Sequence, residues 1–60
     1  MSSKDIIKLL EQNDWYLHSI AGSHHHFKHP NNLGKVTVPH PKKQLPKGTV
    51  HNILKQAGLK

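Results

Sequence analysis

The sequence predicts an α+β domain made of a helix, three antiparallel strands and a second helix, with both helices on one face of the sheet. Three observations support this order. Apolar residues near both ends of the chain recur at helical spacing, those in the middle alternate with polar residues, and glycine, proline and asparagine form short links between the middle segments. Both apolar helix stripes must be buried on the same sheet face, which leaves the opposite face open.

The length of the chain limits what the fold can enclose. A chain of 60 residues buries only about 60% of the surface that its unfolded form exposes, so we expect a single domain over residues 1–60. Little material remains for the walls of a deep pocket. We therefore expect a large partner bound on an open surface.

Two segments have the periodicity of amphipathic helices. The first is predicted over about residues 3–13, where isoleucine and leucine recur on one side of the segment SSKDIIKLLEQND. The second is the segment TVHNILKQAGL, whose apolar residues are spaced i, i+3, i+4 and i+7 from Val50. Helix ends are expected at Ser2 or Ser3, at Gly48 or Thr49, and at Gly58.

The middle of the chain predicts three strands, over about residues 15–21, 23–29 and 35–39. Strict alternation in the first strand puts Leu17 and Ile20 on opposite faces. In the third strand, Val36 and Val38 share one face, which predicts a half-buried strand. Gly22 ends the first strand, and the segment PNNLG supplies the turn before the third.

The charge of the chain favours polyanionic partners. Nine lysines and three acidic residues give a formal net charge of +6. Three of those lysines fall within residues 42–47, in the irregular segment HPKKQLPKG, so the charge is clustered as in a phosphate-binding patch. A basic, soluble surface with no specific partner is the plainer alternative.

The composition also restricts the setting. The chain has no cysteine, which excludes disulfides and thiolate metal ligands. Its first residues, MSSKDIIKLL, include an acid and polar residues where a secretory signal or a membrane span would need an unbroken apolar run. We therefore expect a cytoplasmic protein with no membrane partner.

The segment GSHHHFKHP places four histidines within nine residues. A remnant of a purification tag would lie at a terminus, whereas this run is internal and fits a strand. If Phe27 points toward the helices, alternation sends His25 inward as a structural residue, and His24, His26 and Lys28 face outward. By the same reasoning His29 points inward or to the rim, and the isolated His18 and His51 are expected to be surface or packing residues.

A metal site is one interpretation of the outward histidines. Their Cα atoms would lie about 6.6 Å apart, at ~3.3 Å per residue, which is close enough for His24 and His26 to share a zinc ion. Two imidazoles form a weak site, so His40 or a carboxylate would have to supply a third ligand. The acids all lie in or just after the first helix, and we therefore expect no metal.

Proton transfer is the other interpretation. Histidine has an ordinary pKa near 6.5 and can take or release a proton at neutral pH. RNA carries its own nucleophile, the 2′-hydroxyl, so one imidazole and nearby lysines could promote its cleavage without a metal or another cofactor. His24 is preferred over His26 because Gly22, two residues before it, lets a substrate backbone approach closely.

The chain resembles the HicA toxins of bacterial and archaeal toxin–antitoxin pairs along essentially its whole length. The residues that carry the resemblance are KLL, the tryptophan at the first strand, GSHHHFKHP, VTVPHP, LPKGT and ILKQAGL. The resemblance implies a fold similar to double-stranded-RNA-binding domains and an mRNA interferase that blocks translation until a HicB antitoxin covers it. It also implies that His24 is catalytic. Many members have a basic residue before this glycine, whereas this chain has Ala21, whose methyl group cannot contact a phosphate as a basic side chain would.

Three functions from different classes follow. The first is a metal-independent endoribonuclease with His24 as general acid or base, and with His26 or His40 as candidates for a second proton-transfer group. The second is an RNA-binding module without catalysis, for which shape and phosphate contacts suffice. The third is a subunit that docks on an acidic antitoxin; no DNA partner is expected. The predicted RNA contacts are Gly22, Ser23, His26, Lys28, Lys35, Lys42, Lys43 and Lys47.

Overall fold

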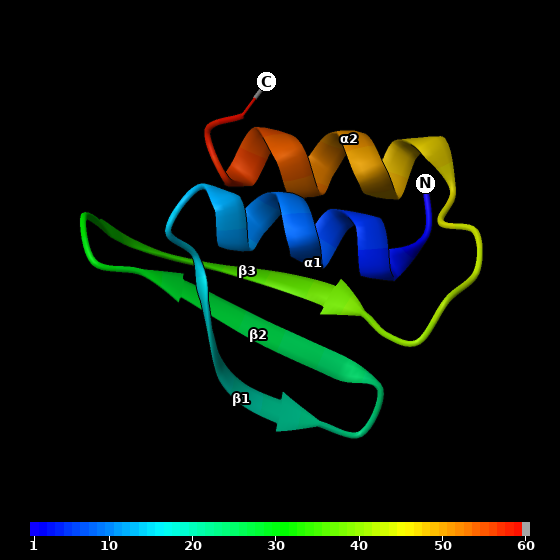
Figure 1. The fold of residues 1–60 in the computed structure, drawn as a ribbon, viewed down its shortest axis with the longest axis horizontal. Coiled ribbons are helices and arrows are strands. Elements are labelled where there is room, and N and C mark those ends of the chain that lie inside the picture. The colour runs from blue at the N-terminus through cyan, green and yellow to red at the C-terminus, as the bar shows by residue number, and fades with distance from the viewer. Residues whose placement is uncertain (60) are drawn as a thin grey trace.

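The computed structural model describes residues 1–59, and its elements follow the predicted order of helix, three strands and helix (Figure 1). The strands form one antiparallel sheet in the order β1-β2-β3. Both helices contact β3 and lie on the same side of the sheet. The elements are α1 (Ser3–Gln12), β1 (Tyr16–Ala21), β2 (His24–His29), β3 (Asn32–Pro39) and α2 (Lys47–Gln56).

Helix α1 begins with a reciprocal cap at Ser2. The Ser2 hydroxyl accepts a hydrogen bond from the Asp5 backbone N–H (3.1 Å), and the Asp5 carboxylate accepts one from the Ser2 backbone N–H (3.2 Å). These bonds to Ser2, helped by the N-terminal ammonium and Lys8, lower the pKa of Asp5. Of the two serines that the sequence offered as a cap, Ser2 is therefore the one used.

Helix α2 begins earlier than the sequence pattern predicted and ends where it predicted. Its first residue is Lys47 and its cap position is Pro46, whose side chain makes no capping hydrogen bond. Proline fixes φ at a helix-compatible value, so a helix can start directly after it without a polar cap. At the other end, Gly58 has φ +72, and the Leu59 N–H bonds to the Leu54 carbonyl (2.9 Å), which is a Schellman ending.

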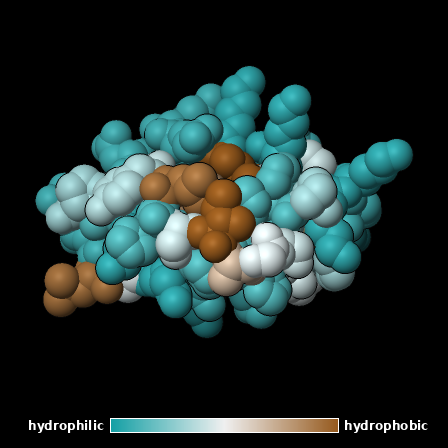
Figure 2. Space-filling model, turned by 90° about the horizontal axis from the view of Figure 1, so that it is seen from below, coloured by the Kyte–Doolittle hydropathy of each residue, from teal (hydrophilic) through white to brown (hydrophobic). Residues whose placement is uncertain are grey.

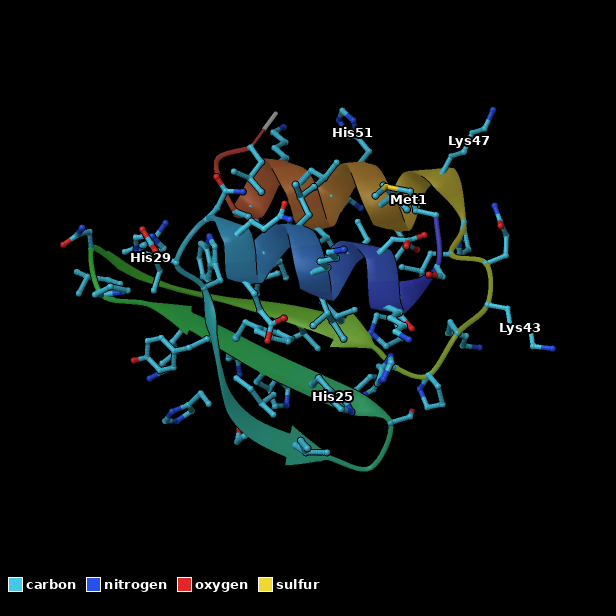
Figure 3. The ribbon with its side chains drawn as sticks, viewed as in Figure 1. Met1, His25, His29, Lys43, Lys47 and His51 are labelled. Carbon is cyan, nitrogen blue, oxygen red and sulfur yellow. The ribbon has the colours of Figure 1, made fainter. Side chains whose placement is uncertain are left out.

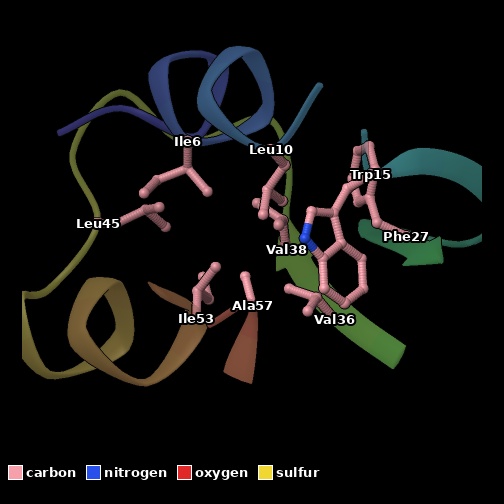
Figure 4. Close-up of a cluster of buried hydrophobic side chains, with 9 residues drawn as sticks. All are labelled: Ile6, Leu10, Trp15, Phe27, Val36, Val38, Leu45, Ile53 and Ala57. Carbon is pink, nitrogen blue, oxygen red and sulfur yellow. The ribbon is translucent and has the colours of Figure 1, made fainter. Parts of the chain in front are cut away.

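The hydrophobic core lies between the two helices and the strands β2 and β3 (Figure 4). Trp15, just before β1, and Leu45, in the loop before α2, close its ends. Because its sheet residues come from β2 and β3, the core leaves β1 outside. Its members are Ile6, Leu10, Trp15, Phe27, Val36, Val38, Leu45, Ile53 and Ala57.

The predicted alternation in β1 is wrong because the strand contains a bulge. Leu17 pairs with Phe27, but the next regular pair joins Ser19 to His26, so His18 is an extra residue. A bulge shifts the pleat by one residue, and residues on either side of it change faces relative to strict alternation. Leu17 and Ile20 consequently lie on the same face of the sheet, the face that the helices occupy.

The third strand is longer than predicted. It starts at Asn32, and the turn before it consists only of Pro30 and Asn31. The His29 ring nitrogen Nδ1 accepts a hydrogen bond from the Asn31 backbone N–H (3.0 Å), which helps to close this tight turn. The predicted burial of Val36 and Val38 is confirmed.

Neither helix could cross a membrane. Each has ten residues, and no helix within residues 1–59 is long and apolar enough for a bilayer span.

Candidate functional site

The sheet face opposite the helices is open and polar. Residues that are paired across antiparallel strands share a face, and Phe27 is buried on the helix side, so its neighbours on β2 point outward. The register then extends this open face onto both neighbouring strands. The open face comprises Tyr16, Ser19 and Ala21 from β1, His24, His26 and Lys28 from β2, and Lys35, Thr37 and Pro39 from β3.

His24 is the first residue of β2 and is exposed. It follows the turn made by Gly22 and Ser23, and its Cα is paired with those of Ala21 and Pro39. Gly22 has φ +59, a conformation that favours glycine, and nothing lies within 4 Å of the position a Cβ would take. The turn thus leaves free space at Gly22, two residues before His24, which a ligand can enter.

His26 lies one pleat further along the open face, and its ring is fixed by β3. Its Nδ1 atom is 2.9 Å from the Thr37 hydroxyl, so the other ring nitrogen, Nε2, is the one left for a ligand. Partial burial lowers the pKa of His26, and the nearby Lys35 and the neighbouring histidine rings lower it further. At neutral pH the ring is therefore held neutral, the form that can accept a proton.

His25 points to the opposite face and contacts His40. The two ring centroids are 4.8 Å apart and nearly perpendicular, and the His40 Nδ1 atom is 2.7 Å from the Ser3 hydroxyl on α1. The geometry agrees with the structural role predicted for His25. It also separates His40 from His24, because His40 is engaged on the helix side of the sheet.

Ser3 ties the basic loop after β3 to the start of α1. Its side chain is 1% exposed. The hydroxyl accepts a hydrogen bond from the Lys42 backbone N–H (2.8 Å), and the Lys42 carbonyl accepts bonds from the Ser3 N–H (2.9 Å) and hydroxyl (3.1 Å). The loop is anchored to the sheet as well, because the His40 N–H bonds to the Ser23 carbonyl (2.8 Å). Lys42 therefore belongs to an ordered segment that begins beside the turn preceding His24.

The predicted lysine contacts fall into three groups. Lys28 and Lys35 lie on the open face, and Lys35 is near enough to His26 to lower its pKa. Lys43 projects from the loop beside the sheet (Figure 3), and Lys42 precedes it in the same ordered segment. Lys47 lies at the start of α2, where it projects away from the sheet. The structure thus places the first group on the same sheet face as His24 and the second in the loop that follows the strand paired with it, and it leaves Lys47 in the helix layer.

The arrangement of titratable groups does not support the zinc interpretation. Within residues 1–59, no three histidine or acidic side chains are grouped so as to hold a metal ion. His40 and a carboxylate were the expected third ligands. The His40 ring is bonded to Ser3 on the other side of the sheet, and the acidic residues all lie in or just after α1.

Three further residues contribute to the site. Thr37 fixes the His26 ring, Ser3 holds the basic loop, and Tyr16 is a half-exposed aromatic ring on the open face beside Lys28. The pairing register reveals Thr37 and Tyr16, and the contact of Ser3 with the loop joins segments about 40 residues apart. No local sequence pattern signals either feature.

The fold and this face define a small, basic α+β domain with an imidazole-bearing open sheet. Residues 3–59 match the family described as HicA toxin of bacterial toxin–antitoxin systems. A solved structure described as "HicA3 and HicB3 toxin-antitoxin complex" contains a chain that is 33% identical, with a TM-score of 0.80, and the match covers 100% of this chain and 97% of that one. None of the curated protein sequences matches significantly. The chain belongs to the HicA toxin family.

Proposed function

We propose that this toxin is a metal-independent endoribonuclease that cleaves mRNA in the cytoplasm and so inhibits translation. The observation that carries the proposal is the position of His24, an exposed imidazole on an open face with four lysines on or beside that face, next to a turn with free space. Its family membership supports the toxin role. A HicB-like antitoxin would neutralise it, as a partner for a strongly basic surface.

The proposed reaction uses the RNA's own nucleophile. The 2′-oxygen attacks the adjacent phosphorus, the bond from phosphorus to the 5′-oxygen breaks, and the products carry a 2′,3′-cyclic phosphate and a 5′-hydroxyl. One proton leaves the 2′-hydroxyl and one is delivered to the leaving 5′-oxygen. His24 performs one of these transfers, and lysines stabilise the charge that develops on the phosphate.

His26 is the better candidate for the second proton transfer. It shares the open face with His24, whereas His40 is bonded to Ser3 on the helix side. The lowered pKa of His26 keeps it neutral near pH 7, which suits a general base. His24 then acts as the general acid, and Lys28, Lys35, Lys42 and Lys43 bind phosphates.

The test is cleavage of a single-stranded RNA by the purified toxin and by a His24→Ala variant. General acid–base catalysis by one side chain contributes about 10²–10⁴-fold, so we expect the variant to lose at least about 100-fold in rate. His51→Ala is the matched control, because His51 is exposed on α2, away from the sheet (Figure 3). Activity in the presence of EDTA separates this mechanism from a metal-dependent one.

An RNA-binding module without catalysis is the second candidate, and the same experiment distinguishes it. The net charge of +6 alone would support RNA binding through phosphates. If the parent protein binds RNA without cleaving it, and His24→Ala behaves identically, the ribonuclease proposal is wrong and the binding module is supported.

A further inference from the structure

The edge strand β1 carries an apolar surface that the helices do not cover. Leu17 is 46% exposed and Ile20 is 55% exposed, and both lie on the helix side of the sheet. Figure 2 shows hydrophobic side chains gathered at the centre of the face seen from the β1 side, with hydrophilic ones around them. We call Leu17 and Ile20 the edge patch. An apolar patch with a polar rim is typical of a protein–protein interface.

The edge patch lies next to the candidate active site. Ile20 precedes Ala21, whose Cα is paired with that of His24. The patch and His24 are on opposite faces of the sheet, but β1 is an edge strand, so a partner that packs on the patch needs only to pass around one strand to reach the imidazole. A single protein can therefore hold the patch and cover His24.

The charge of the chain selects the partner. Every acidic residue lies at or before Asp14, so the sheet, the basic loop and α2 contain none. A second copy of this chain would bring a charge of +6 against another +6, which opposes self-association. An acidic protein with exposed apolar side chains complements both the patch and its surroundings.

The bulge determines the kind of contact. A free edge strand can accept a strand from another chain, but a bulge interrupts the regular ladder and disfavours such pairing. The bulge at His18 interrupts β1, so the strand does not offer an unbroken row of backbone groups for pairing. Side-chain packing on Leu17 and Ile20 is consequently the main attraction that the strand offers.

We propose that the edge patch is the anchor for the antitoxin. An acidic HicB-like protein packs apolar side chains on Leu17 and Ile20 and extends around β1 to cover His24. This inference rests on the antitoxin partner in the proposed function and is independent of RNA cleavage.

The test measures, by titration calorimetry with the full-length toxin, its affinity for an acidic HicB-like protein. Two anchors at an interface centre account for much of its affinity, so Leu17→Lys combined with Ile20→Lys is expected to weaken binding by at least about 100-fold. A second variant, Leu17→Ser with Ile20→Thr, removes the apolar surface without adding charge and should show the same direction of change. Circular dichroism and thermal melting verify that each variant folds.

Leu33→Lys is the matched control, because Leu33 is an apolar residue of β3 that is 107% exposed. It should bind the antitoxin as the parent does. An unchanged affinity in the folded patch variants, an equal loss with Leu33→Lys, or a parent chain that does not bind the antitoxin would each overturn the proposal.

RNA cleavage separates this inference from the ribonuclease proposal. The patch variants should cleave RNA at the parent rate, and added antitoxin should fail to inhibit them. If the parent never cleaves RNA but the patch variants still lose the antitoxin, the docking surface stands and the ribonuclease proposal fails.

Discussion

The two edge strands of the sheet differ in what covers them. β3 buries Val36 and Val38 beneath both helices, whereas all six residues of β1 are exposed. Two ten-residue helices, each about 15 Å long at 1.5 Å per residue, provide enough apolar surface for β2 and β3 and too little for a third strand. In so small a domain, the covered edge contributes stability, and the uncovered edge is available to partners.

The largest expected effect is on the free energy of unfolding, and it compares Phe27 with Leu17, which are paired on the same face of the sheet. Phe27 on β2 is 1% exposed and its partner on β1, Leu17, is 46% exposed. Removing a buried phenylalanine costs about 3–5 kcal/mol, a large part of the stability of a small domain, so Phe27→Ala should be mostly unfolded. Phe27→Leu should lose on the order of 1 kcal/mol and remain measurable.

Leu17→Ala is the counterpart on the open edge. A half-exposed side chain loses little burial, and its unfolding free energy should fall by less than about 1 kcal/mol. Urea denaturation of the three variants supplies the measurement. A loss for Leu17→Ala as large as that for Phe27→Leu would mean that β1 is covered in solution.

A smaller loss of stability is expected when the contact between Ser3 and the basic loop after β3 is removed. The buried Ser3 hydroxyl bonds to Lys42 and lies 2.7 Å from the His40 ring, so Ser3→Ala leaves the partly buried Lys42 N–H without its acceptor. An unsatisfied buried group costs about 1–3 kcal/mol. Because the basic loop is held by this contact, RNA affinity should fall together with stability.

Ser19→Ala, on the exposed strand β1, is the control for Ser3→Ala. It removes a hydroxyl from the open edge and should change the unfolding free energy by no more than about 0.5 kcal/mol. Hydrogen exchange at the Lys42 amide gives a direct readout, because it should become faster only in Ser3→Ala. Unchanged exchange there would show that the loop is held by other contacts.

The sequence predicted the order of elements and the covered face, because periodicity and short links are local signals. It did not predict the bulge at His18, since a bulge is a property of two strands in register and leaves no mark on one of them. It also did not predict that α2 starts directly after Pro46. The expected start relied on a polar or glycine cap, and Pro46 makes no capping hydrogen bond.

The candidate site divides in the same way. The alternation of β2 was enough to place His24 and His26 on the open face, since Phe27 fixed the direction of the pleat. The engagement of His40 with Ser3 could not be foreseen, because it joins a helix start to a loop 37 residues later. Pairing across the fold, rather than residue type, decides which histidines can act together.

The smallest expected effect is on the pH dependence of stability. It arises from His26, whose pKa responds to charges on both edge strands. Its folded pKa is lowered, so below the ordinary value of 6.5 the unfolded chain binds a proton that the folded chain resists. Stability from this group is therefore complete above about pH 6.5 and is lost as the pH falls through the folded pKa. The melting temperature should drop on acidification, and His26→Asn should reduce that drop.

Both edge strands contribute to the lowered pKa of His26. Among the neighbouring groups, the ammonium of Lys35 on β3 lowers the pKa of His26 more than His18 on β1 does. NMR titration of the His26 ring should therefore show a larger upward shift in Lys35→Gln than in His18→Gln. The reverse order would mean that the bulged strand lies closer to His26 than the register indicates, and the open face would then belong to β1 as much as to β3.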